Sequence, residues 1–383
     1  MWFLQTDTLI LLVLLCSLFS LLSVFTGKHY ALLLRFLPLL SVVFLWYFSE
    51  KFTLFYVGYI LVTWLFVLLL RKCTVFRPWI FGILCLCCCI PLIYSRFPSL
   101  PIFGMTLVGI AYNMLKAIDT LYYEYYTGEK AKFEVYLNYM LFLPVLTAGP
   151  VFRYRDFLQT WNKPLSLTVS RFSEAVQRII LGLFQKVVLS ALAMKLLQGV
   201  LALSLSWYRS LAVPALSLCV LYFDMAGYAS IAIGLGGLMG ITVPENFKHP
   251  FQAPSFTQFW RNWHVTVSDW IREHVFILFQ KHRLNKWHGA LISLAVMVLM
   301  GLWHGFTLLF FVDGILLGLI LAVENLTALG TVNKRKTAPW LFKLRCFGVI
   351  LLFALNSMIF TLSTQEIRGV FQGFFLWIGG SAG

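Results

Sequence analysis

Two histidines, His264 and His304, each directly follow a tryptophan and lie beside apolar sequence. His264 belongs to the stretch FWRNWHVTVSDWIRE and His304 to MGLWHG, and the region around them is the most polar part of a chain that is 60% hydrophobic. Ionisable groups are costly in lipid, so those found there usually have a function. Because a neutral imidazole, with an unperturbed pKa of about 6.5, can take a proton from a hydroxyl, the pattern predicts general-base chemistry at these two residues.

Other histidine chemistries have less support in the sequence. A histidine in an apolar run is often only a packed, hydrogen-bonded residue, and this alternative stays open for each of the two. No HxxxH or histidine–carboxylate pattern indicates a metal, so no metal site is expected. No G-x-S-x-G sequence is present to anchor a serine triad. Neither Trp-His motif contains a serine or cysteine in a recognisable activating pattern.

The composition is that of a membrane protein. Only 12% of the 383 residues are charged, against about 25% in soluble proteins. We predict an all-α polytopic membrane protein with about eleven embedded segments, and one domain over residues 1–383. The net charge of +15 is attributed to cytoplasmic loops, because no basic patch suited to nucleic acid is evident. The eight cysteines match no zinc spacing and are expected to pack as small apolar residues.

Apolar runs near the length that crosses a bilayer, about 20 residues, recur along the chain. The early spans expected are 9–25, 32–47, 54–70, 80–94 and 102–121, and later apolar segments are 187–206, 211–222, 291–302, 307–326, 348–362 and 370–378. The first eight residues lack Lys and Arg, whereas basic residues occur at Lys28 and at Arg71, Lys72 and Arg77. The positive-inside rule therefore predicts an outside N-terminus and cytoplasmic loops at Lys28 and at 71–77.

Several buried polar groups are predicted to line a cavity. Gly149 and Pro150 break the apolar run at 136–146 just before Arg153, which indicates a re-entrant segment, because irregular backbone at membrane depth needs cover from protein or water. Asp224 precedes a glycine-rich apolar run and is expected to pair, cap or line the same cavity. Lys116 and Asp119 are spaced to lie on one helical face.

These stretches together resemble the membrane-bound O-acyltransferase family. Alongside FWRNWHVTVSDWIRE and MGLWHG stand KAID, TAGPVFRYRDF, YFDMAGYASIAIGLGGLMGI and PENFKHPF, in family order from about residue 109 to 317. The resemblance implies a helical bundle with a central tunnel through the membrane. It also implies that His304 is the main catalytic residue and that His264 is its partner. Trp263, Trp303 and Asn262 are expected beside them, with Asn262 as a weaker candidate to stabilise an oxyanion.

The resemblance further implies an acyl thioester arriving from the cytoplasm and a hydroxyl acceptor from outside. The compact length, the MGLWHGFT form and KAID favour the branch that transfers D-alanyl groups to teichoic acid. TAGPVFRYRDF favours the alginate-type O-acetyltransferase branch, because the D-alanyl branch usually has aspartate where Phe152 stands. In the D-alanyl branch the donor is a carrier protein bearing phosphopantetheine, and no cofactor is bound by the enzyme itself.

A basic amphipathic stretch is the expected docking site for such a carrier. Residues 265–280 are amphipathic and run into KHRLNKWH, which suits a helix on the cytoplasmic surface of the membrane. Lys281, Arg283 and Lys286 are predicted to attract an acidic carrier. The alternative from another functional class is a transporter or flippase, which would use broken helices and buried charges equally well, although the paired Trp-His motifs argue against it.

Overall fold

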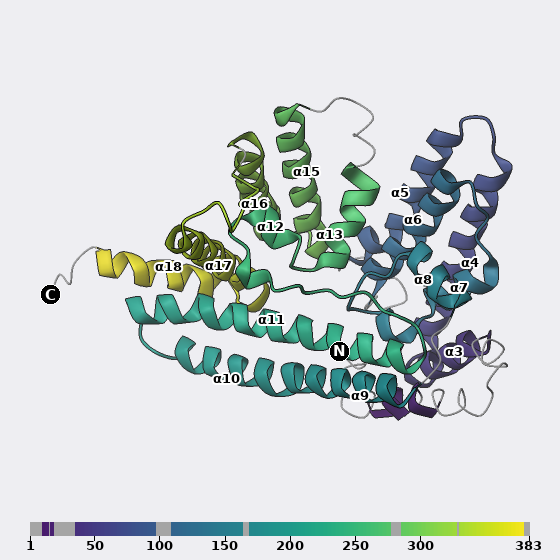
Figure 1. Ribbon diagram of the computed structural model, residues 1–383, viewed down its shortest axis with the longest axis horizontal. Helices are drawn as coiled ribbons and strands as arrows, with labels where there is room; N and C mark the ends of the chain where they lie inside the picture. Colours follow the sequence, from purple (N-terminus) through teal and green to yellow (C-terminus); the bar gives the residue numbers. More distant parts are fainter. Residues whose placement is uncertain are drawn as a thin grey trace. The chain divides into compact units, whose positions relative to one another are not determined.

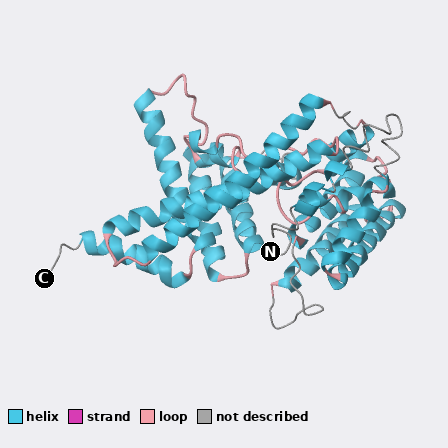
Figure 2. Ribbon diagram, turned by 90° about the horizontal axis from the view of Figure 1, so that it is seen from below, coloured by secondary structure: helices cyan, strands magenta, loops and turns pink. Residues whose placement is uncertain are grey.

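The computed structural model describes residues 10–14, 16–18, 35–96, 109–163, 168–276, 285–327 and 329–378. Over these residues the chain is built of helices joined by loops, without strands (Figure 2). Seven of the described helices are long and apolar enough to cross a bilayer. The chain is therefore an all-α polytopic membrane protein, as its composition predicts. Most of the first span expected, 9–25, lies outside the described residues.

The chain divides into two compact units, Met1–Ile180 with Ser230–Pro244, and Leu181–Ala229 with Glu245–Gly383. The single domain expected from the sequence stays a prediction. The first unit holds α3 (Leu37–Phe48), α4 (Glu50–Lys72), α5 (Arg77–Ser95), α6 (Ile110–Thr127), α7 (Phe133–Met140), α8 (Tyr154–Asn162) and most of α9 (Val169–Leu183) (Figure 1). The second holds α10 (Ser190–Leu201), most of α11 (Trp207–Leu238), α12 (Phe256–Trp260), α13 (Val265–Ile271), α15 (Lys286–His304), α16 (Leu308–Thr327), α17 (Pro339–Thr361) and α18 (Thr364–Ile378).

In the first unit, α6 fastens a broken segment that runs from α7 to α8. Lys116 donates from Nζ to the backbone oxygen of Tyr139 at 3.1 Å, and the Asp119 carboxylate accepts from the backbone N–H of Tyr154. Tyr139 and Tyr154 are fully buried. The KAID residues thus satisfy backbone groups where the chain leaves helical geometry, which an apolar interior requires.

Three helix boundaries differ from those expected. The tyrosine-rich stretch after residue 121 continues α6 to Thr127, where Gly128 adopts a left-handed conformation that ends helices. Where an apolar segment is expected at 187–206, one helical run extends from Val169 to Leu201 through a π turn at Phe184–Leu189. α17 begins at Pro339, before the apolar segment expected at 348–362, and so includes Lys343 and Arg345. In each case packing extends a helix beyond the limit that polarity alone suggests.

Helices α15 and α16 form a closely packed antiparallel pair in the second unit. A Cβ atom added at Gly314 would lie 2.6 Å from the backbone oxygen of Met297, and one added at Gly318 would lie 2.9 Å from Leu294 Cα. A Cβ atom at Gly301 would fall on the backbone oxygen of Phe310. Small residues let membrane helices approach in this way, and the close approach fixes the residues on both helices relative to one another.

This packing predicts the effect of a single methyl group. Gly301→Ala should force α15 and α16 apart and lower the free energy of unfolding by roughly 1–3 kcal/mol, the usual cost of overpacking. Gly289→Ala is the matched control, because it lies in the same helix and no atom is within 4 Å of its added Cβ. We expect thermal unfolding in detergent to show a lower Tm for Gly301→Ala only. Equal Tm values for both variants would contradict the close approach.

Candidate active site

The segment before His264 is held by polar groups from a distant helix. Ser255 caps α12 by accepting from the backbone N–H of Gln258, as its position in the sequence predicts. The Glu324 carboxylate, on α16, accepts from the backbone N–H groups of Phe256 and Thr257 at 2.8 Å each, and from the Thr257 hydroxyl at 2.7 Å. An acidic side chain at a helix N-terminus satisfies donors that the helix leaves free. This clamp fixes the start of α12 against α16.

His264 lies in a short irregular turn between α12 and α13. Its backbone is left-handed, with φ 46° and ψ 49°, which is uncommon for any residue other than glycine. The side chain is 5% exposed, and Nδ1 lies 3.1 Å from Asn246 Oδ1. Backbone bonds between the 246–248 segment and this turn also hold it, with Val265 donating to Asn246 and Lys248 donating to Asn262.

The neighbours of Asn246 determine the tautomer of His264. Asn246 Oδ1 accepts from the Thr266 hydroxyl at 2.8 Å and from the Thr266 backbone N–H at 3.4 Å. A backbone N–H can only donate, so the atom facing His264 is the amide oxygen, which can only accept. His264 Nδ1 therefore carries the proton, and Nε2 is left as the acceptor of the ring. Burial, and to a smaller extent nearby His304, lowers the pKa of His264 to about 3, so the ring stays neutral.

His304 is the last residue of α15. Its ring contacts those of Trp303 and Phe360, with centroids 4.9 and 5.0 Å apart, and stacks on Phe310 of α16 at 6.0 Å. Gly305 ends the helix in an extended conformation while its N–H still donates to Gly301 at 3.1 Å. The imidazole is thus held by aromatic side chains from α16 and α17 at a helix terminus.

The structure brings the two histidines together in one cavity of about 220 Å³. Asp313 of α16 and Asn356 of α17 are the other polar side chains in its lining, and Asn356 donates to the Asp313 carboxylate. Trp263, 3% exposed, forms part of the wall and packs on Phe259 and Phe353. The remaining lining residues are Leu221, Met225, Trp260, Met297, Met300, Gly301, Leu317, Phe353 and Phe360. We call this cavity the histidine chamber.

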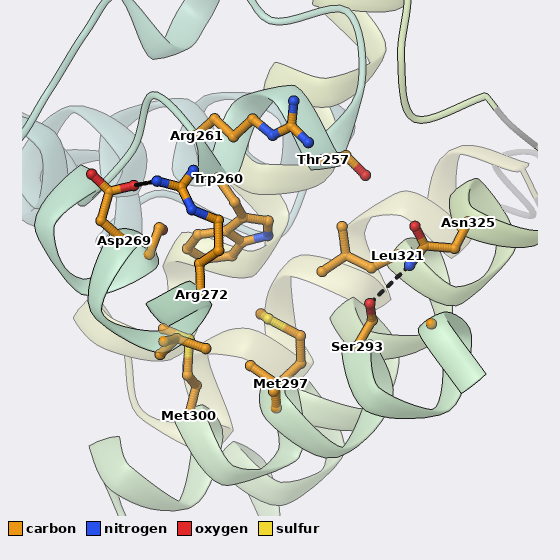
Figure 3. A pocket seen from close by; sticks show the side chains of 14 residues that line it. Thr257, Trp260, Arg261, Asp269, Arg272, Ser293, Met297, Met300, Leu321 and Asn325 are labelled. Atoms are coloured by element: carbon orange, nitrogen blue, oxygen red, sulfur yellow. Dashed lines mark hydrogen bonds and ion pairs between the residues drawn. The ribbon is translucent and has the colours of Figure 1, made fainter. Parts of the chain in front are cut away.

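A second cavity, of about 350 Å³, adjoins the histidine chamber. The two share Trp260, Met297 and Met300 as lining residues. Figure 3 shows the polar side of the second cavity, where Arg272 pairs with Asp269 at 2.8 Å. Arg261 is exposed on the same side. We call it the vestibule; its lining is polar at Arg261, Asp269 and Arg272 and apolar at the residues it shares with the histidine chamber.

The other residues predicted for the site are placed differently. Trp303 contacts the His304 ring but is not among the lining residues of the chamber. Asn262 donates from Nδ2 to the backbone oxygen of Gln258 at 2.7 Å, so its amide stabilises the end of α12. Asp224 is half exposed and pairs with Lys186 in the π turn. Arg153, in the first unit, pairs with Asp156 at 2.7 Å.

The carrier-docking residues are only partly described. Lys281 and Arg283 lie outside the described residues, and Lys286 is exposed at the start of α15. No group of three or more His, Cys, Asp or Glu side chains in the described part of the chain has an arrangement that could hold a metal ion.

Three residues of the site were not predicted from the sequence. Asn246 lies in PENFKHPF. The prolines of this stretch indicate a loop, but nothing in it indicates that the Asn246 amide contacts a histidine. Asp313 is the one charged residue of its apolar run from 307 to 323, a signal that could have found it. Asn356 gives no comparable signal, because only its contact with Asp313 makes it a site residue.

Comparison with known proteins identifies the family. The sequence model of the membrane-bound O-acyltransferase (MBOAT) family matches residues 126–360, a range that includes both histidines. The chain belongs to this family. The resemblance to this family that the Trp-His motifs indicate is thereby confirmed over more than half of the chain.

The MBOAT relatives fall into groups named for different activities. The chain is 31% identical over 279 residues to a probable alginate O-acetylase of Pseudomonas fluorescens, covering 70% of this chain and 53% of the relative. It is 30% identical to a teichoic acid D-alanyltransferase of Streptococcus thermophilus, covering 61% of each. It is 29% identical to a peptidoglycan O-acetyltransferase of Helicobacter pylori, over 53% of this chain and 40% of the relative. The chain thus spans about half the length of the first of these MBOAT relatives.

The contact between His264 and Asn246 predicts a pH effect in an acyl-transfer assay. Asn246→Asp places a carboxylate beside Nδ1 and should raise the pKa of His264. His264 then becomes protonated at higher pH, so the acid limb of the pH–rate profile should move upward. In the parent protein the pKa near 3 keeps this residue neutral throughout the usual assay range.

The control for this variant is Asn333→Asp, which makes the same change at an exposed position. Its pH–rate profile should match that of the parent protein. An unshifted acid limb in Asn246→Asp, with the protein folded, would contradict the assignment of Asn246 as the partner of His264.

Proposed function

We propose that this MBOAT chain transfers a small acyl group, D-alanyl, from a thioester on a carrier protein to a hydroxyl of a cell-envelope polymer such as teichoic acid. The observation that carries the proposal is the meeting of His264 and His304 in one buried chamber. Two imidazoles there can hold and deprotonate a hydroxyl away from bulk water. The vestibule, which shares three lining residues with the chamber, is the proposed route by which the thioester approaches.

The mechanism follows from the placement of the two rings. His304 takes the proton of the acceptor hydroxyl as its oxygen attacks the thioester carbonyl. The C–S bond then breaks, the ester is left on the acceptor, and His304 returns the proton to the departing thiolate. His264 presents Nε2 as an acceptor, so its tautomer suits orientation of the hydroxyl better than donation to an oxyanion.

Trp260 offers a donor for the carbonyl oxygen. Its Nε1–H is buried without a hydrogen-bond partner among the described residues, and its side chain lines both the chamber and the vestibule. A buried donor without a partner is unfavourable unless a ligand supplies the acceptor. In this proposal the thioester carbonyl does so, and the bond strengthens as negative charge develops on that oxygen.

A second candidate function is transfer of an acetyl group to an exported polysaccharide. The similarity to the probable alginate O-acetylase of Pseudomonas fluorescens favours acetyl transfer. Phe152 in TAGPVFRYRDF favours it too. The two candidates share the histidine chemistry and differ in the acyl group and the acceptor. A transporter would need neither a general base nor a thioester.

Replacement of the histidines tests the mechanism. Loss of a general base typically costs 10²–10⁴-fold in rate, so we expect a fall of roughly that size in single-turnover transfer by His304→Ala. His264→Ala should also impair transfer, and the double variant should be little worse than His304→Ala, because the residues act on one step. Trp260→Phe, which removes the N–H and keeps an aromatic ring, should cost roughly 10-fold or more.

His288→Ala is the control for these variants, because His288 is exposed on the same helix as His304. It should transfer at the parent rate. Substantial transfer by a folded His304→Ala protein would overturn the role of that residue as the base.

We also propose the topology and the donor side. The N-terminus is outside, the loop at Arg71–Arg77 is cytoplasmic, and an acidic carrier docks on the cytoplasmic face at Lys281, Arg283 and Lys286. The membrane concerned is the cell membrane. Lys286 begins α15, the helix that ends at His304, so these two residues lie at opposite ends of one helix.

Vesicles of defined orientation test this proposal. Carrier added to inside-out vesicles should support transfer, whereas carrier added to right-side-out vesicles should not. Reversing the three charges to Glu should slow association at low salt, since complementary charge acts mainly on the association rate. The same reversal at Lys334, Arg335 and Lys336 is the matched control. Equal effects of the two reversals, or transfer only in right-side-out vesicles, would contradict the proposed docking site.

A further inference from the structure

The histidine chamber contains a carboxyl group that general-base transfer does not require. Asp313 is 5% exposed and lines the chamber together with His264 and His304. It lies on α16, close in sequence to the turn that connects this helix to His304. The mechanism above uses two imidazoles and an indole N–H, and it leaves Asp313 without a role.

The described lining gives Asp313 a hydrogen-bond donor but no Lys or Arg. Asn356 of α17 donates from Nδ2 to Asp313 Oδ1. None of the residues that line the described chamber is Lys or Arg, and burial keeps His264 neutral. A buried carboxylate is costly unless it is paired as well as hydrogen-bonded. A permanent cation on a bound substrate would therefore be stabilised beside Asp313.

Backbone packing holds this carboxyl group in place. The neighbouring Gly314 lies against Met297 and Val298 of α15, so an added Cβ would come within 2.7 Å of their backbone atoms. Gly301, one turn before His304, meets Phe310 in the same way. Because both contacts involve backbone, Asp313 and His304 belong to one rigid helix pair. A group bound at Asp313 would be held in a fixed relation to the general base.

We propose that Asp313 and Asn356 form a subsite for the ammonium group of an aminoacyl thioester. This inference rests on the proposed function and names the residues that recognise its D-alanyl group. A D-alanyl group carries an ammonium beside the carbonyl that His304 acts on, whereas an acetyl group has nothing to pair with the carboxylate. The aromatic walls of the chamber, including Trp260 and Phe360, also suit a cation. The volume of about 220 Å³ suits a small acyl group.

Three thioesters of pantetheine test the subsite: D-alanyl, D-lactyl and acetyl. D-lactyl keeps the size of D-alanyl but has a neutral hydroxyl where D-alanyl has its ammonium. The parent protein, in proteoliposomes with purified teichoic acid, should prefer D-alanyl to D-lactyl by roughly 30-fold or more in kcat/KM, as expected for a buried charge pair. This measurement needs no variant, so it does not depend on whether a variant folds.

Asp313→Asn gives the second readout. It should reduce D-alanyl transfer by a similar factor while changing D-lactyl and acetyl transfer little, and so remove the preference. Glu134→Gln is the control for a carboxylate-to-amide change, because Glu134 forms an exposed pair with Arg35, which contributes little. It should keep the parent preference.

The possible failures are distinguishable. If the parent protein transfers D-lactyl or acetyl as fast as D-alanyl, the subsite is wrong and acyl transfer itself stands. An equal loss for all three thioesters in Asp313→Asn would assign the residue to positioning of His304 and overturn the subsite. Transfer of none of them by the parent protein would overturn the proposed function together with the inference.

Discussion

The close approach of α15 and α16 is the constraint on which the site depends. The two helices meet at three glycines, Gly301, Gly314 and Gly318, which have no Cβ atom to hold the helices apart. The atoms that these glycines face are mostly backbone. Side chains can adjust to a neighbour by changing rotamer, but backbone in a packed helix pair cannot. His304 at the end of one helix and Asp313 near the start of the other are consequently fixed together. The chemistry of the chamber is set by this packing before any substrate enters.

The second histidine depends on polar contacts instead of close packing. His264 lies where α12 and α13 are separated by a left-handed residue, and such a turn exposes backbone donors and acceptors that an apolar interior cannot satisfy. Asn246 supplies partners for this turn, and Glu324 does the same for the start of α12, both from elsewhere in the same unit. The Asn246 contact also selects the tautomer of the ring. His304 is therefore positioned by van der Waals contact and His264 by hydrogen bonds.

The sequence predicts the parts of this molecule that follow from local pattern. Apolar length predicts helices such as α4, α15 and α16, and the serine at 255 predicts the start of α12. Local pattern does not predict where a helix continues past a polar residue. The run from Val169 to Leu201 does so at its π turn, where Lys186 pairs with Asp224. Such an extension depends on a partner far away in sequence.

The same distinction applies to the site. The Trp-His pairs indicate His264 and His304 because an imidazole in an apolar run is unusual in itself. Asn246 and Asn356 matter only through what they contact, and a single sequence does not record those contacts. Asn262 and Asp224 have side chains of a type common in active sites, so the sequence indicates them as site residues. In the structure, however, Asn262 donates to the backbone of α12 and Asp224 pairs with Lys186.

In the proposed mechanism acyl transfer is direct, and both substrates meet between the two histidines. Intact-protein mass spectrometry, after mixing the purified protein with a labelled acyl thioester in the absence of acceptor, distinguishes this mechanism from one with an acyl-enzyme. No acyl group should become covalently attached to the protein, and label should move only once a hydroxyl acceptor is added. A stable acyl-enzyme that forms without acceptor, and then passes its label to acceptor at the rate of turnover, would contradict it.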